Sequence, residues 1–262
     1  MLAASRGAAR LLAALLLAAG MTLGARDVGV TTRLLFGSCN RALSEQPMWA
    51  HVLAREPDVW IWAGDNVYGD KADGFDLRTG TLRRVPATIK GLRALYATQR
   101  EVPGYQQLLR SNTTVLGTWD DHDFGVNDGD SHPLRAQSQM LMLNFLNEPA
   151  LSPRRFQKGV YGAHLIRAPR PTSEAPASAK RARGRSGVLV VLLDVRYNKD
   201  PWGTPDGDFL GEAQWAWLER TLRGSRARAH LIVTGLQVHA HVTDFDLHDF
   251  PLLTVCYLSV RP

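Results

Sequence analysis

The chain has 262 residues, of which 45% are hydrophobic and 21% charged, as in an ordinary globular protein with one large α/β domain or two small ones. Its formal net charge is +6, but the Arg and Lys residues gather in a few places, without an accompanying stripe of basic and aromatic residues. We therefore expect no nucleic-acid binding.

The N-terminal segment has the pattern of a secretory signal. Arg6 and Arg10 precede an apolar run at residues 11–19, and small residues follow as far as Ala25. We expect residues 1–25 to be a signal peptide, which makes the protein secreted or lumenal. The apolar run is shorter than the roughly 20 residues of a membrane span. An uncleaved anchor is the alternative, and only in that case do we expect contact with a membrane.

The first half of the chain reads as strands alternating with helices, which indicates a βαβ unit and a partly parallel sheet. Continuous apolar runs indicate the strands, and helical spacing of apolar residues, ended by Pro57, indicates the first helix. In chain order we expect a strand at residues 32–36, a helix at 46–55, a strand at 59–63, a partly helical region at 78–109 with Tyr96 and Tyr105 on its core face, and a strand at 113–118.

The second half continues the pattern around one irregular segment. We expect a helix at residues 135–146, strands at 160–166 and 188–193, a helix at 212–222 with Trp215 and Leu218 facing inward, and a strand at 231–235. Residues 168–187 are rich in Pro, Ser and Ala and contain a basic run, so we interpret them as a flexible surface insertion. The basic run is suited to contact with anionic lipid or to cleavage by a protease, although a solvated loop is the simpler interpretation.

Polar clusters follow three of the apolar strands. They are Cys39-Asn40, Asp65-Asn66-Val67-Tyr68 and Asp120-Asp121-His122. A sheet that contains all three strands brings the clusters together at one edge. Close carboxylates repel one another unless a cation lies among them, while thiolate, imidazole and phenolate suit iron or zinc. The sequence therefore predicts a metal-dependent hydrolytic site.

Each cluster also has an ordinary structural explanation. A cysteine after a strand is commonly a small buried apolar residue, and Cys39 can alternatively form a disulfide with Cys256. Gly-Asp-Asn is a common turn, and His122 alone suits a hydrogen-bonded surface position. Residues 123–130 resemble a calcium loop, but the glycine and the distal glutamate of an EF-hand are misplaced. The shared position at strand ends favours a site.

Several segments resemble the PhoD-like alkaline phosphatases of the calcineurin-like metallophosphoesterase superfamily. The resemblance extends from about residue 33 to residue 238, and the Trp-Asp-Asp-His pattern is specific. The matching segments are GSCN at residues 37–40, WAGDNVYGD at 62–70, WDDHDFGVNDGD at 119–130, LLDVRY at 192–197 and LGEAQWAWLE at 210–219.

The resemblance implies an α/β fold of two packed mixed β-sheets flanked by helices, the four-layer sandwich of metallophosphoesterases. It also implies hydrolysis of phosphate monoesters or diesters by a metal-bound hydroxide at a centre of Fe³⁺ and Ca²⁺, or other divalent metals. By position, the implied metal ligands are Cys39, Asp65, Tyr68, Asp121 and Asn127, the implied catalytic residues are His122 and Asp121, and the implied supporting residues are Asp120, Asn66 and Asp123.

One departure from the family pattern concerns the end of the chain. Members carry a later Ser-Gly-Asp-x-His segment that completes the metal shell, and this chain has nothing like it. Substitute ligands are available in principle at His239, His241, Asp244, Asp246, His248 and Asp249. We expect instead that residues 33–262 are an incomplete phosphatase domain whose C-terminal part is missing. The alternatives are an inactive binding or regulatory module and a chain whose exposed hydrophobic edge prevents folding.

Overall fold

The structure is a computed structural model that describes residues 32–77, 81–167, 187–236 and 252–255. The expected signal peptide, nearly all of the insertion, the substitute ligands at 239–249 and Cys256 lie outside these residues. Within them, no helix combines the length and the apolar character that crossing a membrane requires.

The first sheet is parallel throughout its described strands. Its order is β1-β2-β5, formed by β1 (Leu34–Gly37), β2 (Val59–Ala63) and β5 (Thr114–Thr118). Helix α2 (Met48–Leu53) connects β1 to β2, which confirms the predicted βαβ unit. Gly37 pairs with Trp62, and Trp62 pairs with Gly117, so the carboxyl ends of all three strands meet at one edge.

The second sheet is mixed. Its order is β6-β7-β8-β9, formed by β6 (Gly162–Arg167), β7 (Gly187–Leu192), β8 (Ala229–Val233) and β9 (Leu252–Val255). Strand β6 is antiparallel to β7, and the other neighbours are parallel. Helix α8 (Glu212–Gly224) forms the long connection between β7 and β8, as parallel pairing requires.

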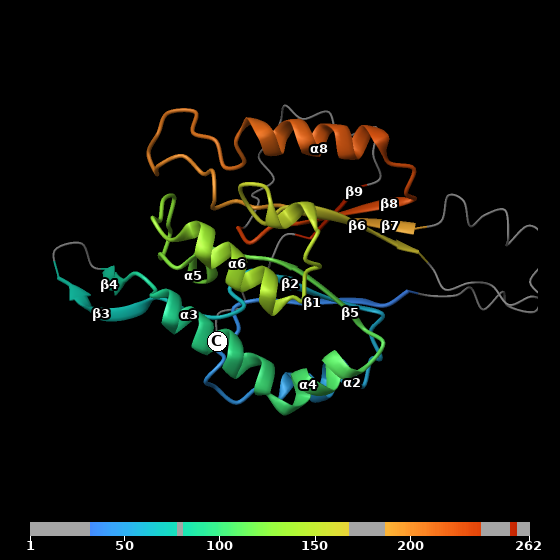
Figure 1. Ribbon diagram of the computed structural model, residues 1–262, viewed down its shortest axis with the longest axis horizontal. Coiled ribbons are helices and arrows are strands. Elements are labelled where there is room, and N and C mark those ends of the chain that lie inside the picture. The colour runs from blue at the N-terminus through green and yellow to red at the C-terminus, as the bar shows by residue number, and fades with distance from the viewer. Residues whose placement is uncertain (1–31, 78–80, 168–186, 237–251, 256–262) are drawn as a thin grey trace, which may run out of the picture. The chain divides into compact units, whose positions relative to one another are not determined.

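Alternating side chains of β2 divide the core between two interfaces. Trp60 and Trp62 pack among the helices α2, α3 (Ile89–Glu101), α4 (Pro103–Arg110) and α6 (Arg135–Phe145). Ile61, between them in sequence, packs against Val190 and Leu231 of the second sheet. On the far face of that sheet, Val191 and Leu193 pack with Leu218 of α8. The layers therefore run helix, sheet, sheet, helix, with α8 and the pair α2 and α4 on opposite sides in Figure 1, and the predicted fold class is confirmed.

The helix-facing core is aromatic. The ring of Trp49 lies 5.0 Å from that of Trp60 and 5.1 Å from that of Tyr105. The indole N–H of Trp62 donates to the hydroxyl of Tyr105 at 3.2 Å, so burial leaves neither polar group unpaired. Truncating one of these side chains to Ala is expected to cost about 3–5 kcal/mol. Tyr96 and Tyr105 are both buried, as predicted.

Helices α3 and α4 confirm that the region at residues 78–109 is helical in part. Some local structure had not been predicted: β4 (Thr81–Val85), at the start of that region, forms a β-hairpin with the preceding β3 (Lys71–Asp76), and the acidic run forms a single helical turn, α5 (Asp121–Phe124). A short 3-10 helix covers Pro153–Arg155. Trp215 does not face inward: it is 40% exposed and donates its indole N–H to Asp208, whereas Leu218 is buried as predicted. The inward face of α8 instead includes Gln214, one residue earlier.

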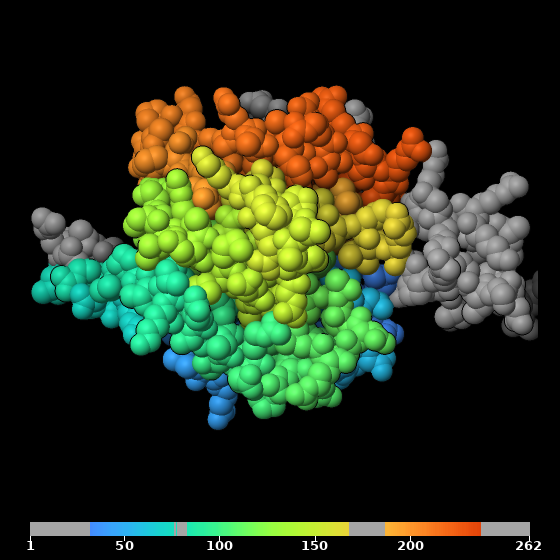
Figure 2. All heavy atoms as spheres, viewed as in Figure 1, coloured from blue at the N-terminus to red at the C-terminus, as the bar shows by residue number. Residues whose placement is uncertain are grey.

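A loop between β7 and α8 packs against the segment that follows the acidic cluster. Trp202 donates its indole N–H to the carbonyl of Asp128 at 2.5 Å and its backbone N–H to Asp130 at 3.3 Å. In Figure 2 the orange atoms of this later segment lie directly against the yellow-green atoms of the earlier one. The loop therefore supports one side of the acidic region.

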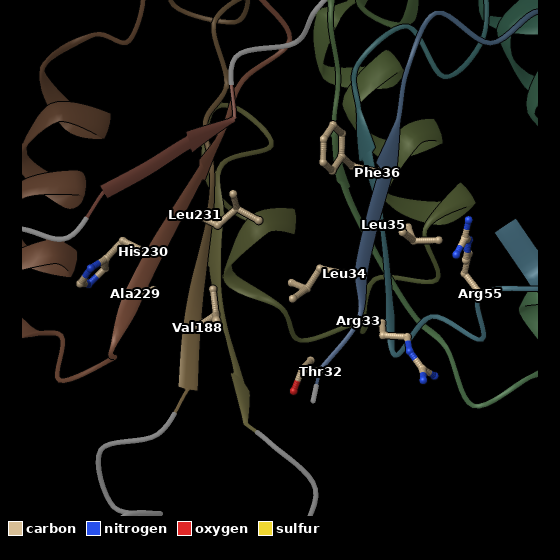
Figure 3. Close-up of a pocket in the computed structure, with 10 residues that line it drawn as sticks. All are labelled: Thr32, Arg33, Leu34, Leu35, Phe36, Arg55, Val188, Ala229, His230 and Leu231. Atoms are coloured by element: carbon tan, nitrogen blue, oxygen red, sulfur yellow. The ribbon is translucent and has the colours of Figure 1, made fainter. Parts of the chain in front are cut away.

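A groove of about 640 Å³ lies at the opposite end of the strands. Figure 3 shows Leu34 and Phe36 pointing from β1 toward the second sheet, where Val188 and Leu231 face them. Strand β1 pairs only with β2 among the described strands, and Phe36 is 48% exposed. The groove is thus an apolar opening near the amino ends of the strands, apart from the polar clusters at their carboxyl ends.

Candidate metal centre

Two tight turns bring the first site residues together at the carboxyl edge of the first sheet. Cys39 and Asp65 both adopt the left-handed backbone conformation, with φ of 51° and 50°. Their turns are joined by backbone hydrogen bonds from Cys39 to Gly64 at 3.3 Å and from Asn40 to Asp65 at 2.8 Å. Non-glycine residues rarely adopt this conformation, and it is concentrated at functional sites. The result is a contact of 3.6 Å between Cys39 Sγ and Asp65 Oδ2.

Asp65, Asp121 and His122 form the centre of the site. Potential ligand atoms of the three side chains all lie within 4.8 Å of one another, and all three residues are buried. The backbone N–H of His122 donates to Asp65 Oδ1 at 3.3 Å. His122 Nε2 lies 3.9 Å from Asp65 Oδ2, too far for a hydrogen bond. Two carboxylates and an imidazole from separate strand ends therefore converge, as the sequence predicted.

The fully buried carboxylate of Asp123 ties two of the polar clusters together. It accepts the backbone N–H groups of Asn66 at 3.0 Å, Val67 at 3.2 Å and Asp120 at 3.3 Å, and the hydroxyl of Tyr96 at 3.0 Å. Burial raises the pKa of Asp123 to about 7, although these hydrogen bonds oppose the rise. Asp123 thus holds the turn after β2 against the turn after β5.

The first acid of the run, Asp120, is largely buried and pairs with Arg196 from the segment after β7. Arg196 Nε lies 2.5 Å from Asp120 Oδ1, and the side chain of Arg196 is 1% exposed. Burial raises the pKa of Asp120, and the guanidinium of Arg196 counteracts the rise. The pair therefore connects the second sheet to the site. Arg196 had no predicted role, although it lies in one of the segments that resemble the family.

Asp70 is a site residue to which the sequence assigned no role. Its Oδ1 lies 2.5 Å from His122 Nδ1, and its Oδ2 accepts from Arg84 of β4 at 2.9 Å. Burial alone would raise the pKa of Asp70, but His122 and Arg84 outweigh burial and lower it. The carboxylate is thus ionised between two donors and fixes the orientation of the imidazole. Its place at the end of the Gly-Asp-Asn-Val-Tyr-Gly-Asp run was the available signal.

Tyr68 and Asn66 also reach the site. The ring of Tyr68 lies 4.0 Å from the ring of His122, at an angle of 33°. Burial, Asp65 and a hydrogen bond with Cys39 raise the pKa of the Tyr68 phenol. Asn66 donates to the carbonyl of Thr118 at 3.1 Å, while its buried Oδ1 has no hydrogen-bond partner among the described residues.

Asn127 lies beside the centre rather than within it. Its amide donates to Asp128 at 2.7 Å, and the backbone N–H of Asp128 donates to Asp121 Oδ2 at 2.7 Å. In the described part of the chain, the cluster with metal-ligand spacing contains Asp65, Asp121 and His122. Asn127 therefore remains a predicted ligand; it lies one residue before Asp128, whose backbone N–H donates to Asp121.

The electrostatics of the centre fit a bound cation. The pKa of Asp65 is raised well above its usual 3.8, first by burial and then by the charges of Asp120, Asp121, Asp123 and Cys39. A cation among these groups would relieve their repulsion. Carboxylates suit a hard metal, and Cys39, which is an exposed free thiol, adds a softer donor.

Comparisons with known proteins agree with the resemblance. Residues 34–139 match the family model for the PhoD-like phosphatase. A search of curated proteins found no match. Among solved structures, one described as the structure of PhoD is similar, with a TM-score of 0.53 and 18% sequence identity. The match covers 76% of this chain and 40% of that chain, and at this identity it shows a shared fold. The predicted resemblance is therefore confirmed.

Proposed function

We propose that the protein is a metal-dependent phosphoric ester hydrolase, similar to the PhoD-like phosphatases, that acts on phosphate monoesters or diesters. The observation that carries this proposal is the convergence of Asp65, Asp121 and His122 within 4.8 Å at the carboxyl edge of the sheet. These residues lie within the segment 34–139 that matches the phosphatase family. The family match supports the proposed chemistry, and the geometry supports the proposed choice of residues.

The proposed metal ligands are Asp65 and Asp121, together with Cys39 and Tyr68. We also propose Fe³⁺ and Ca²⁺ as the metals and Asn127 as a calcium contact, following the resemblance. When bound, such cations supply Lewis acidity toward the phosphate and lower the pKa of a water molecule. Asp65 is central because Cys39 and His122 both contact its carboxylate.

His122 is the proposed group that acts on the substrate. Asp70 engages its Nδ1, which leaves Nε2 as the nitrogen available to a phosphate ester. A proton on Nε2 can be donated to a phosphate oxygen, where charge develops, or to the leaving oxygen. Asp70 and Arg84 hold the imidazole in the orientation that this role requires.

The test uses the purified full chain, supplied with iron and calcium, and measures release of p-nitrophenol from p-nitrophenyl phosphate. Asp65→Asn is expected to lower kcat/KM by more than about 100-fold, beyond the loss that supporting residues cause. Asp206→Asn is a matched control, because exposed Asp206 has φ of 54°, close to the 50° of Asp65. Asparagine tolerates this conformation at both positions.

Metal analysis of the same samples separates the possible outcomes. Turnover that a chelator abolishes and that Asp65→Asn removes supports the hydrolase. Bound metal without any turnover would instead favour a binding module. Activity that survives both Asp65→Asn and the chelator would show that the proposed centre is not the site of hydrolysis.

A further inference from the structure

We propose that Arg41 binds the phosphate group of the substrate and favours dianionic phosphomonoesters over singly charged diesters, an inference that rests on the proposed function and extends it. Arg41 follows Cys39 and Asn40 directly in the turn after β1. This turn lies at the same sheet edge as Asp65 and His122, so the basic side chain emerges next to the candidate metal centre.

The guanidinium of Arg41 lies over a site residue. Its central carbon is 5.2 Å from the centre of the Tyr68 ring, and the Tyr68 ring lies 4.0 Å from that of His122. Burial and the charge of Asp65 raise the pKa of Tyr68, and the positive charge of Arg41 opposes part of that rise, so Arg41 and Asp65 both interact electrostatically with the phenol. The Tyr68 ring is thus a shared neighbour of the Arg41 guanidinium and of the imidazole proposed to meet the phosphate.

The backbone around Arg41 is fixed, although its side chain is exposed. The preceding residue, Asn40, is buried and donates from its backbone to Asp65 at 2.8 Å and from its side chain to Gln99 at 2.6 Å. The carbonyl of Arg41 accepts the backbone N–H of Ser44 at 2.9 Å. Because the backbone that carries this exposed guanidinium is already ordered, ligand binding costs little additional backbone entropy.

Charge pairing distinguishes Arg41 from the other arginines near the site. Arg84 is paired with Asp70 at 2.9 Å, and Arg196 is paired with Asp120 at 2.5 Å. In the described part of the chain, no carboxylate lies within ion-pair distance of Arg41. Its planar N–H donors therefore remain available to an external anion, and their fork matches two oxygens of a phosphate.

The ester class follows from charge. A phosphomonoester carries up to two negative charges on three terminal oxygens, whereas a diester carries one charge on two. A guanidinium next to the metal centre gains more from the dianion, because the electrostatic attraction grows with the charge of its partner. We therefore expect Arg41 to contribute to monoester hydrolysis more than to diester hydrolysis.

The test compares Arg41→Ala and Arg41→Lys with wild type in the metal-loaded full chain. For Arg41→Ala, kcat/KM toward p-nitrophenyl phosphate should fall about 10–100-fold, the loss of a charge-assisted hydrogen bond. With bis(p-nitrophenyl) phosphate the fall in kcat/KM should be less than about 3-fold, because the guanidinium attracts a singly charged diester less strongly than a dianionic monoester. Arg41→Lys should restore part of the loss, because it keeps the charge without the planar fork. Arg110→Ala, at the last residue of α4, is the control and should match wild type.

Isothermal titration with inorganic phosphate provides a readout that does not need turnover, and its Kd should rise at least about 10-fold in Arg41→Ala. Equal losses of kcat/KM for both esters in Arg41→Ala, or an unchanged affinity for phosphate, would overturn the role of Arg41. The proposed hydrolase function would still stand in that case, provided that the wild type is active. Phosphate binding that depends on Arg41 without any turnover supports Arg41 and rejects the hydrolase. A wild-type chain that neither turns over ester nor binds phosphate overturns both.

Discussion

Nδ1 of His122 lies 2.5 Å from Oδ1 of Asp70, and the second oxygen of Asp70 is held by Arg84 at 2.9 Å. The two acids that contact His122 therefore have different positions: Asp70 on the Nδ1 side and Asp65 near Nε2. The hairpin formed by β3 and β4 contributes Arg84 to this arrangement. A segment without any recognisable site motif thus stabilises the orientation of the candidate catalytic histidine.

Asp70→Asn is expected to lower kcat about 10–100-fold, because the amide no longer fixes the imidazole through a charged hydrogen bond. Bound metal should be retained, since Asp70 contacts His122 and Arg84, neither of which is a proposed metal ligand. Kinetics and metal content of the variant check this expectation. Asp73→Asn changes an exposed acid of the adjacent hairpin of β3 and β4, paired with Arg83, and should leave kcat unchanged. Equal activity of the two variants would contradict a positioning role.

Arg196→Met should lower the free energy of unfolding by about 3–5 kcal/mol, because it leaves a largely buried Asp120 without its partner. The side chains of the pair are 1% and 13% exposed. Arg223→Met breaks the exposed pair with Glu219 and should cost less than about 0.5 kcal/mol. Urea unfolding measures both changes. Similar losses for the two variants would show that burial does not strengthen the Asp120 pair.

Gly235→Ala should destabilise the protein by about 1–3 kcal/mol through overpacking. A Cβ at Gly235 would lie 2.6 Å from the carbonyl oxygen of Trp119 and 2.7 Å from Cβ of Asp120, so the acidic cluster would have to shift. Gly224→Ala, with no neighbour within 4 Å, should change stability by less than about 1 kcal/mol. Thermal unfolding compares the two, and an unchanged melting temperature of Gly235→Ala would refute the close approach.

Acid should weaken the fold through the pair formed by Glu148 and Arg154, at 2.7 Å. Burial alone would raise the pKa of Glu148, but Arg154 and Ser152 outweigh burial and lower it from 4.5. The unfolded chain therefore takes up a proton at higher pH than the folded protein does. The stability from this pair is present above pH 4.5 and is lost as the pH falls through the lowered pKa.

Urea unfolding between neutral pH and acid checks this pH dependence. Glu148→Gln should be less stable than wild type at neutral pH, and the difference should shrink as the pH falls below 4.5. Glu219→Gln, at an exposed carboxylate, is the control and should follow wild type. A constant difference between wild type and Glu148→Gln across the pH range would contradict the expectation.

The predicted strands and helices were largely confirmed, since they depend on runs of apolar residues. Strand β2 covers Val59–Ala63, as predicted, because five consecutive buried side chains suit a strand packed on both faces. The hairpin of β3 and β4 was missed, because it packs few apolar side chains and leaves Phe75 exposed. The predicted inward orientation of Trp215 was wrong because tertiary contacts, including its hydrogen bond to Asp208, override helical periodicity.

By itself, the sequence determined which strand ends meet at the site, because parallel strands with polar residues after them share a carboxyl edge. It thereby indicated that Cys39, Asp65 and His122 lie together. Only the tertiary structure decided the pairings of Asp70 with His122 and of Asp120 with Arg196. Such pairings depend on the packing of side chains from distant segments, which no local pattern of apolar and polar residues encodes.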